Sequence, residues 1–163
     1  MISIIDFQNI ARTRLGDAQC LLEQGHLDGA FYLGGYAVEI ALKTRLCKVE
    51  NLAGFPKDKD EFKLYKQEGF INVSHKQEKW FSHDLENLKN LIQNAEQEKG
   101  MQSIDFEYDY SVDWGFVIEW KETKRYQEIG SYNLEKVTNF VKSIENILPV
   151  ILQTPLLEQG GNS

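Results

Sequence analysis

The amino-acid sequence predicts an all-α fold, an up-and-down bundle of four to five helices. Three long segments repeat apolar residues at steps of three and four, which is the period of an amphipathic helix: 4–23, 83–99 and 134–151. A fourth segment, 28–48, is apolar or small around most of its helical circumference. A helix of that kind must be covered on several sides, so we expect it at the centre of the bundle.

The first two helices are expected to form an antiparallel hairpin. The first should run from Ile4 to Glu23, with Gly25 ending it because glycine adopts the left-handed conformation without steric cost. Asp28 is expected to cap the second helix, which continues to about Lys48. The polar residues of this second helix fall on one narrow stripe: Asp28, Tyr32, Gly35, Tyr36, Glu39 and Lys43.

The middle of the chain has weaker patterns. Residues 50–81 show no clear period and are interpreted as an insertion between core helices, with a short helical turn at 62–67. Ser82 is expected to cap a helix from His83 to about Lys99, with its apolar face on the following residues: Leu85, Leu88, Leu91, Ile92 and Ala95. The alternating acidic and aromatic residues 105–110 are interpreted as an extended connection, because no second strand is evident.

The last part of the chain is expected to be helical again. Ser111 should cap a helix over 112–124, and Asn133 should cap the final long helix, whose end Pro149 should kink or shorten. Its core positions are expected to be Leu134, Val137, Phe140, Val141, Ile144, Ile147, Leu148 and Ile151. We expect a single domain over 1–157 and a flexible tail over 158–163.

Composition narrows the functional classes. The chain has 163 residues, of which 42% are hydrophobic and 26% charged, and a net charge of −7, which argues against sequence-blind coating of nucleic acid. No apolar run is long enough to span a membrane, and no secretory signal is evident. The two cysteines, Cys20 and Cys47, do not have the spacing of metal ligands, and we expect neither a metal nor a cofactor. They are interpreted as small apolar residues of a protein in a reducing compartment, which favours a cytoplasmic location.

Several short motifs resemble the HEPN (higher eukaryotes and prokaryotes nucleotide-binding) family. In chain order, they are Ala11, Arg14, Leu15 and Asp17-Ala18, then Gly25, Asp28-Gly29-Ala30, Tyr32-Leu33, Gly35-Tyr36-Ala37-Val38-Glu39 and Ala41-Leu42-Lys43, and later His83-Asp84-Leu85, Leu88, Trp120 and Arg125-Tyr126. The resemblance covers most of the chain except 48–80. It implies a helical bundle, frequently a homodimer, that acts on or binds nucleotides or RNA. Many members of the family occur in toxin–antitoxin pairs with a nucleotidyltransferase or in other defence systems.

The resemblance also implies a test for catalysis. Metal-independent endoribonucleases of the family carry an arginine followed, after four to six residues, by a histidine near the start of the final helix. No arginine of this chain has that histidine, and after Arg125 the corresponding residues are Gly130, Ser131 and Tyr132. Tyrosine, with a pKa of about 10, is a poor general base at neutral pH. We therefore expect the protein not to be a ribonuclease.

Six residues are expected to form a ligand site or an interface: Tyr32, Tyr36, Glu39, Lys43, Arg125 and Tyr126. Glu39 and Lys43 lie one helical turn apart and can equally form a simple structural pair. On so apolar a helix, however, a charged pair should line a groove or an interface, because isolated burial of a charge is costly. His83 is expected to have a local capping or packing role rather than to bind a ligand, and His26 and His75 are expected to be solvated.

Three functions remain open from the sequence. The leading one is a non-catalytic HEPN-type module that dimerises and binds a nucleotide, RNA or a partner protein, as part of a toxin–antitoxin or defence pair. The second is a metal-independent endoribonuclease with an atypical active site, in which Arg125 and His83 come together only in the fold or the dimer. The third is an interaction subunit of a nucleotidyltransferase, with the stripe as its interface.

Overall fold

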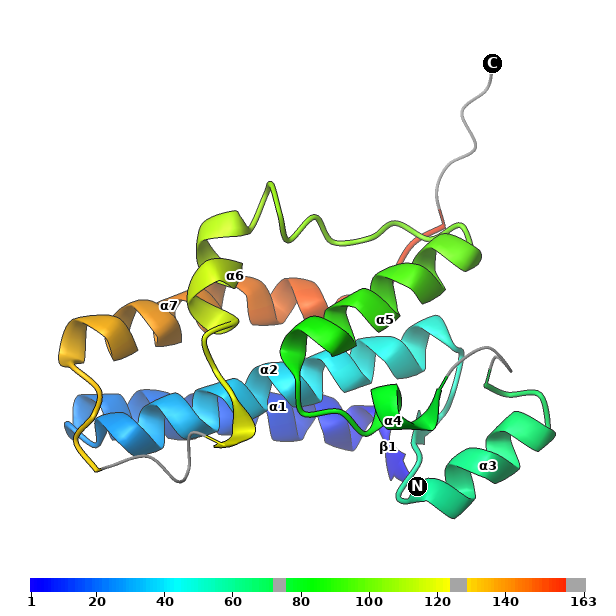
Figure 1. Cartoon of the computed structure of the whole chain (residues 1–163), viewed down its shortest axis with the longest axis horizontal. Helices are drawn as coiled ribbons and strands as arrows, with labels where there is room; N and C mark the ends of the chain where they lie inside the picture. Colours follow the sequence, from blue (N-terminus) through cyan, green and yellow to red (C-terminus); the bar gives the residue numbers. More distant parts are fainter. Residues whose placement is uncertain (72–75, 124–128, 158–163) are drawn as a thin grey trace.

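A computed structural model describes residues 1–71, 76–123 and 129–157, and within them the fold is an all-α bundle with one very small sheet (Figure 1). The helices are α1 (Ile4–Glu23), α2 (Leu27–Val49), α3 (Lys59–Gln67), α4 (Gln77–Trp80), α5 (Leu85–Glu98), α6 (Ser111–Val117) and α7 (Leu134–Leu152). The strands β1 (Ile2–Ser3) and β2 (Gly54–Phe55) pair antiparallel. The predicted fold class is confirmed.

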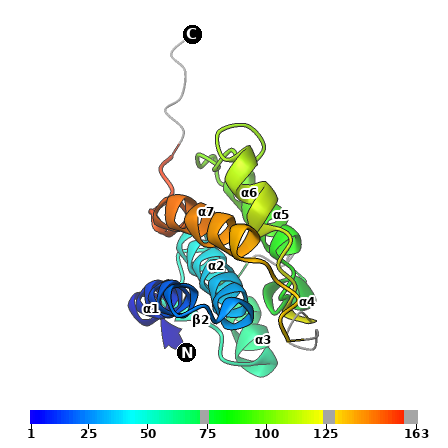
Figure 2. The same cartoon turned by 90° about the vertical axis from the view of Figure 1, so that its left-hand side faces the viewer.

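Helix α2 is the central helix of the bundle, as its nearly uniform apolar surface predicts. Seen along the bundle, α2 is surrounded by α1, α7, α5 and the region of α3 and α4 (Figure 2). Helices α1 and α2 run antiparallel and pack along their length, which confirms the predicted hairpin. The observed bounds of α1 are those predicted, and Gly25 after it has a φ of 76°.

The predicted cap of α2 is wrong. The helix begins at Leu27 rather than after Asp28, and its N-cap residue, His26, makes no capping hydrogen bond through its side chain. The Asp28 carboxylate instead accepts a hydrogen bond from the amide of Gly130, at 2.7 Å. The Asp28 side chain thus bonds to a residue 102 positions away in the sequence instead of capping the first turn of its own helix.

Helix α5 begins two residues later than predicted. Its cap is Asp84 rather than Ser82, because the Asp84 carboxylate accepts a hydrogen bond from the amide of Asn87, at 3.0 Å. His83 is therefore outside the helix and free to contact another element. The five predicted core positions of α5 are all buried.

Residues 50–81 contribute to the core more than their sequence pattern suggested. Four of their large side chains are buried in the main hydrophobic cluster: Phe55, Phe62, Ile71 and Trp80. Strand β2 pairs with β1 through only two residues of each, which is too short a segment for periodicity to reveal. His75 lies outside the described residues.

The connection before α6 is a series of turns, and the extended conformation predicted for residues 105–110 is wrong. The Asp105 carboxylate accepts hydrogen bonds from the amides of Glu107 and Tyr108, at 3.1 and 2.8 Å, which holds the turn. Helix α6 ends at Val117, well before the predicted Lys124, and no side chain caps it at Tyr110.

Helix α7 follows its prediction except at its ends. Asn133 caps it by accepting a hydrogen bond from the amide of Lys136, at 2.8 Å. Leu134, predicted to be a core residue, is 60% exposed, so that prediction is wrong. Pro149 lies inside the helix, which continues to Leu152. The predicted tail, 158–163, lies outside the described residues.

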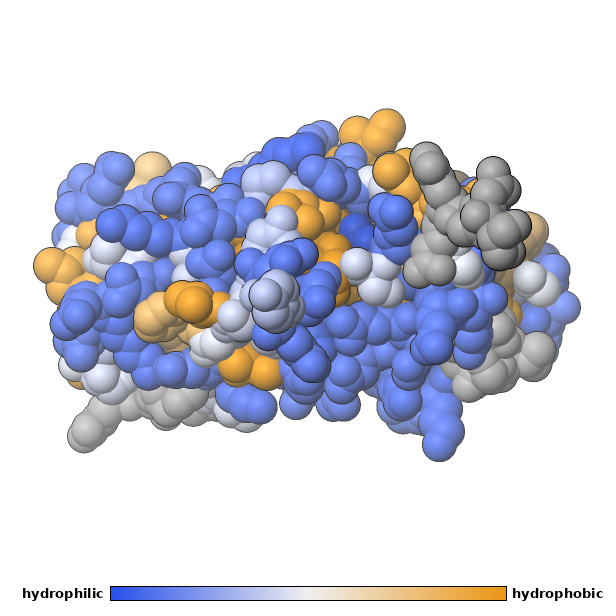
Figure 3. Space-filling model, turned by 90° about the horizontal axis from the view of Figure 1, so that it is seen from above, coloured by the Kyte–Doolittle hydropathy of each residue, from blue (hydrophilic) through white to orange (hydrophobic). Residues whose placement is uncertain are grey.

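The surface is mainly hydrophilic on the face seen from above (Figure 3). The apolar residues on this face form small separated patches (Figure 3). Among the described residues, no helix combines the length and apolar character that crossing a bilayer requires.

The two cysteines should differ sharply in reactivity. Cys20 is exposed on α1, whereas burial inside α2 raises the pKa of the Cys47 thiol to about 12. Because the thiolate is the reactive form, a thiol reagent at pH 8 is expected to modify one cysteine in the native protein and both in denaturant. Modification of Cys47 at the rate of Cys20 in the native protein would contradict the closed packing around α2. Cys20→Ser is the control that isolates Cys47.

Candidate functional site

Glu39 and Lys43 form a buried ion pair at the middle of α2. The Lys43 Nζ lies 2.7 Å from the Glu39 Oε1, and the side chains are only 9% and 4% exposed. Lys43 also lies over the Phe55 ring, 5.5 Å from its centroid, so β2 covers this end of the stripe. The pair itself was expected from the spacing of one helical turn, whereas its enclosure by residues 50–81 was not.

His83 contacts the same carboxylate from the turn before α5. Its Nδ1 lies 3.1 and 3.0 Å from the two oxygens of Glu39, although the two residues are 44 positions apart. The imidazole is 45% exposed, and its Nε2 lies 3.8 Å from an oxygen of Glu122. His83 was predicted to have a local capping or packing role. The capping alternative is wrong because Asp84 caps the helix, and His83 instead contacts Glu39 on α2.

This arrangement constrains the chemistry of the imidazole. When His83 is neutral, a proton on Nδ1 can be donated to Glu39, and Nε2 then has a free lone pair. When His83 is protonated, both nitrogens donate, and Nε2 faces Glu122. In either state the buried carboxylate orients the ring, and in the neutral state the lone pair of Nε2 can accept a hydrogen bond from a ligand.

Two tyrosines extend the site along α2. Tyr32 and Tyr36 are half-buried, and their hydroxyl oxygens lie 3.3 Å apart, within hydrogen-bonding distance. Burial, the Tyr32 hydroxyl, and the negative charges of Glu39 and Glu122 all raise the pKa of Tyr36, in that order of importance. Tyr36 therefore stays a neutral hydroxyl that can donate a hydrogen bond at any physiological pH. Tyr36 and Glu39 lie three residues apart on α2, so they are neighbours on its surface.

Trp120 packs against the Tyr36 ring and helps to hold it in place. The indole is buried and meets the Tyr36 ring edge to face, with 5.3 Å between ring centroids. It lies so close to α2 that a Cβ added at Gly35 would be 2.1 Å from the indole. Gly35 is therefore part of the construction of the site, because only glycine leaves room for Trp120.

The structure brings together five of the residues singled out in the sequence: Tyr32, Tyr36, Glu39, Lys43 and His83. Arg125 and Tyr126 lie outside the described residues, so their place in the site remains a prediction. Lys121 pairs with Asp84, at 3.7 Å.

Sequence reasoning missed Phe55 and Glu122. Phe55 comes from the segment 50–81, which has no clear period, and Glu122 comes from the segment 112–124, which was predicted to be one helix. Neither lies on α2, so the spacing of residues along the stripe could not have identified them. The three elements that meet at His83 are thus α2, the turn before α5 and the segment after Trp120.

The described part of the site contains no arrangement suited to a metal ion. Over the described ranges, no three histidine, cysteine, aspartate or glutamate side chains are placed to hold one. No family model, curated protein or solved structure matches this chain. The resemblance to the HEPN family therefore rests on the sequence motifs, and the chemistry of the site rests on its geometry.

Proposed function

We propose that this protein is a HEPN-type helical module that binds a nucleotide or RNA through the stripe of α2. The observation that supports this best is the half-exposed His83, anchored by a buried carboxylate that Lys43 neutralises. Burying a charged pair on an apolar helix is costly and seldom more stabilising than apolar packing. The cluster is therefore better explained by a binding role than by stability alone.

The chemistry of the site favours contacts with the base and the ribose over contacts with phosphate. Tyr32, Tyr36 and His83 offer hydroxyl groups, a ring nitrogen and aromatic surface, which suit the edges of a base and the ribose hydroxyls. Glu39, Glu122 and Asp84 put more negative than positive charge around the imidazole, which disfavours a phosphate there. For a phosphate group, the sequence offers Arg125, whose guanidinium can bind phosphate oxygens in pairs.

Ligand binding should be visible as thermal stabilisation. We expect ATP, GTP or a short single-stranded RNA to raise the Tm, by about 3–6 °C at ten times the Kd, because such an excess stabilises the native state by about 1.4 kcal/mol. His83→Gln keeps a donor for Glu39 but removes the ring nitrogen that faces the ligand, so it should abolish most of this shift. Differential scanning fluorimetry measures both effects.

Two variants control this experiment. His26→Gln alters another exposed histidine, at the start of α2, and should leave the shift unchanged. Tyr36→Phe should reduce the shift while keeping the packing on Trp120. The proposal fails if none of the three ligands changes the Tm, or if His83→Gln responds like the wild type.

A second candidate function is metal-independent RNA cleavage, and one observation favours it. A histidine whose Nδ1 donates to a carboxylate presents a basic Nε2, which is the arrangement that a general base requires. Cleavage of a fluorogenic RNA in EDTA that disappears in His83→Gln and survives in His26→Gln would establish it. Absence of cleavage together with a Tm shift would leave the binding module as the function.

A further inference from the structure

The imidazole of His83 and the carboxylate of Glu122 place two hydrogen-bond acceptors side by side. The His83 Nε2 lies 3.8 Å from the Glu122 Oε2, which is too far for a hydrogen bond between them. In the neutral ring whose Nδ1 donates to Glu39, Nε2 carries a lone pair and accepts, as the carboxylate does. The two side chains are 45% and 26% exposed, so a ligand can reach both acceptors.

The surroundings hold this acceptor pair in place and favour a ligand that donates hydrogen bonds. Glu39 anchors the ring through both of its oxygens, at 3.1 and 3.0 Å, and its side chain is only 4% exposed. Asp84, the next residue after His83, pairs with Lys121 at 3.7 Å. Among the described charges around the imidazole, three carboxylates therefore face two ammonium groups: Glu39, Asp84 and Glu122 against Lys43 and Lys121.

Of the common bases, guanine is the one that offers two adjacent donors. Its N1–H and its 2-amino group lie side by side, whereas adenine and cytosine place an amino donor beside an acceptor nitrogen, and uracil has one N–H between two carbonyls. The two guanine nitrogens share a carbon, so they lie about 2.3 Å apart, given C–N bonds of about 1.33 Å. Acceptors 3.8 Å apart then bend each hydrogen bond by roughly 20°, which keeps the donor angle above about 150°.

We propose that the site selects guanine, whose N1–H donates to the His83 Nε2 and whose 2-amino group donates to the Glu122 carboxylate. This inference rests on the proposed binding of a nucleotide or RNA and adds the base that is bound. Adenine in the same place would turn an acceptor nitrogen towards an acceptor, so one of the two contacts would be lost and its lone pair left unpaired. Glu122 thereby determines the specificity of the site, and His83 fixes the edge of the base.

Three triphosphates that differ only in the base test the assignment: GTP, ATP, and ITP, which is GTP without the 2-amino group. We measure their Kd by isothermal titration calorimetry at pH 8, where histidine is ordinarily neutral. The Kd of GTP should be lower than those of ITP and ATP by about tenfold or more, because each lacks a hydrogen bond to a charged or anchored acceptor. Equal Kd values for GTP and ATP would overturn the choice of guanine and leave nucleotide binding intact. Absence of binding by all three would overturn both.

Glu122→Gln tests the contact with the 2-amino group directly, because it replaces one acceptor oxygen by a donor. The variant should raise the Kd of GTP by about tenfold and change that of ITP little, since ITP has no group to lose there. Glu119→Gln is the matched control on the same segment, where the carboxylate pairs with Lys136 on α7, at 2.5 Å, and it should keep the preference for GTP. If Glu122→Gln weakens GTP and ITP equally, the proposed contact is wrong.

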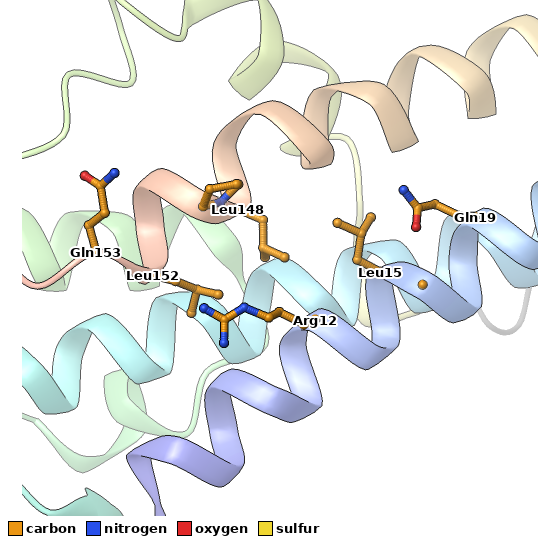
Figure 4. Close-up of a pocket in the computed structure, with 8 residues that line it drawn as sticks. Arg12, Leu15, Gln19, Leu148, Leu152 and Gln153 are labelled. Carbon is orange, nitrogen blue, oxygen red and sulfur yellow. The ribbon is translucent and has the colours of Figure 1, made fainter.

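A second control removes a cation that lies elsewhere on the bundle. A cavity of about 430 Å³ between α1 and α7 is lined mainly by leucine and polar uncharged side chains, and Arg12 is the only charged residue among those that line it (Figure 4). Its charge attracts the triphosphate that GTP and ATP share, and it offers no pair of acceptors to a base. Arg12→Gln should therefore leave the ratio of the two Kd values unchanged. A ratio that falls to one in this variant would locate the discrimination in the cavity and overturn the assignment to His83 and Glu122.

Discussion

Gly35→Ala is expected to destabilise the protein by about 3 kcal/mol, although alanine is the better helix former. The new methyl group would lie 2.1–2.2 Å from three atoms of the Trp120 ring, far inside contact distance. Trp120 is 1% exposed and held against Tyr36, so it cannot move away without opening the core. Overpacking of this kind costs about 1–3 kcal/mol or more, which exceeds the gain of up to about 1 kcal/mol in helix propensity. Urea denaturation followed by circular dichroism measures the change.

The same substitution at Gly115 separates overpacking from propensity. Gly115 lies inside α6, and a Cβ there meets nothing within 4 Å. Gly115→Ala should therefore leave stability unchanged or raise it by up to about 1 kcal/mol. In Gly35→Ala, we also expect a shift in the Trp120 fluorescence spectrum and a loss of nucleotide-induced stabilisation, because the indole supports Tyr36. A Gly35→Ala protein as stable as the wild type would contradict the close contact of α2 with Trp120.

Arg45→Met is expected to cost about 3–5 kcal/mol, because it leaves a buried carboxylate without its counter-charge. The Arg45 Nε lies 2.5 Å from the Glu96 Oε1, and the two side chains are 5% and 1% exposed. Arg45 also donates to the main-chain carbonyls of Gln102 and Gln153, at 3.3 and 3.4 Å. It thus joins α2 and α5 to the segments that follow α5 and α7. Equilibrium urea denaturation at pH 7 measures the loss.

Dependence on pH distinguishes a lost charge partner from lost packing. Burial raises the pKa of Glu96 even beside Arg45, which opposes the rise. Since the folded state then binds a proton more readily than the unfolded state, the ionised carboxylate lowers stability, and lowering the pH relieves this penalty. The destabilisation in Arg45→Met should therefore shrink as the pH falls from 7 towards 5. The double variant Arg45→Met with Glu96→Leu should recover most of the loss, whereas a double variant as unstable as Arg45→Met would contradict the electrostatic explanation.

The fold could be predicted to a large extent because its main signals are local. The bounds of α1, the left-handed Gly25 and the buried face of α5 all follow from periodicity and from conformational preferences within a few residues. Local rules failed where a distant group competed for a side chain. Asp28 bonds to the amide of Gly130 instead of capping α2.

The contacts of the candidate site are likewise of two kinds, local ones within α2 and ones between distant segments. The sequence by itself determined that α2 is the central helix and that Glu39 and Lys43 can pair, because residues one turn apart on a helix always lie close together. Only the tertiary structure decided that His83 binds the Glu39 carboxylate, that Phe55 covers Lys43 and that Trp120 occupies the space at Gly35. These contacts join segments separated by many residues, and they depend on how whole helices pack, which no local spacing in the sequence specifies.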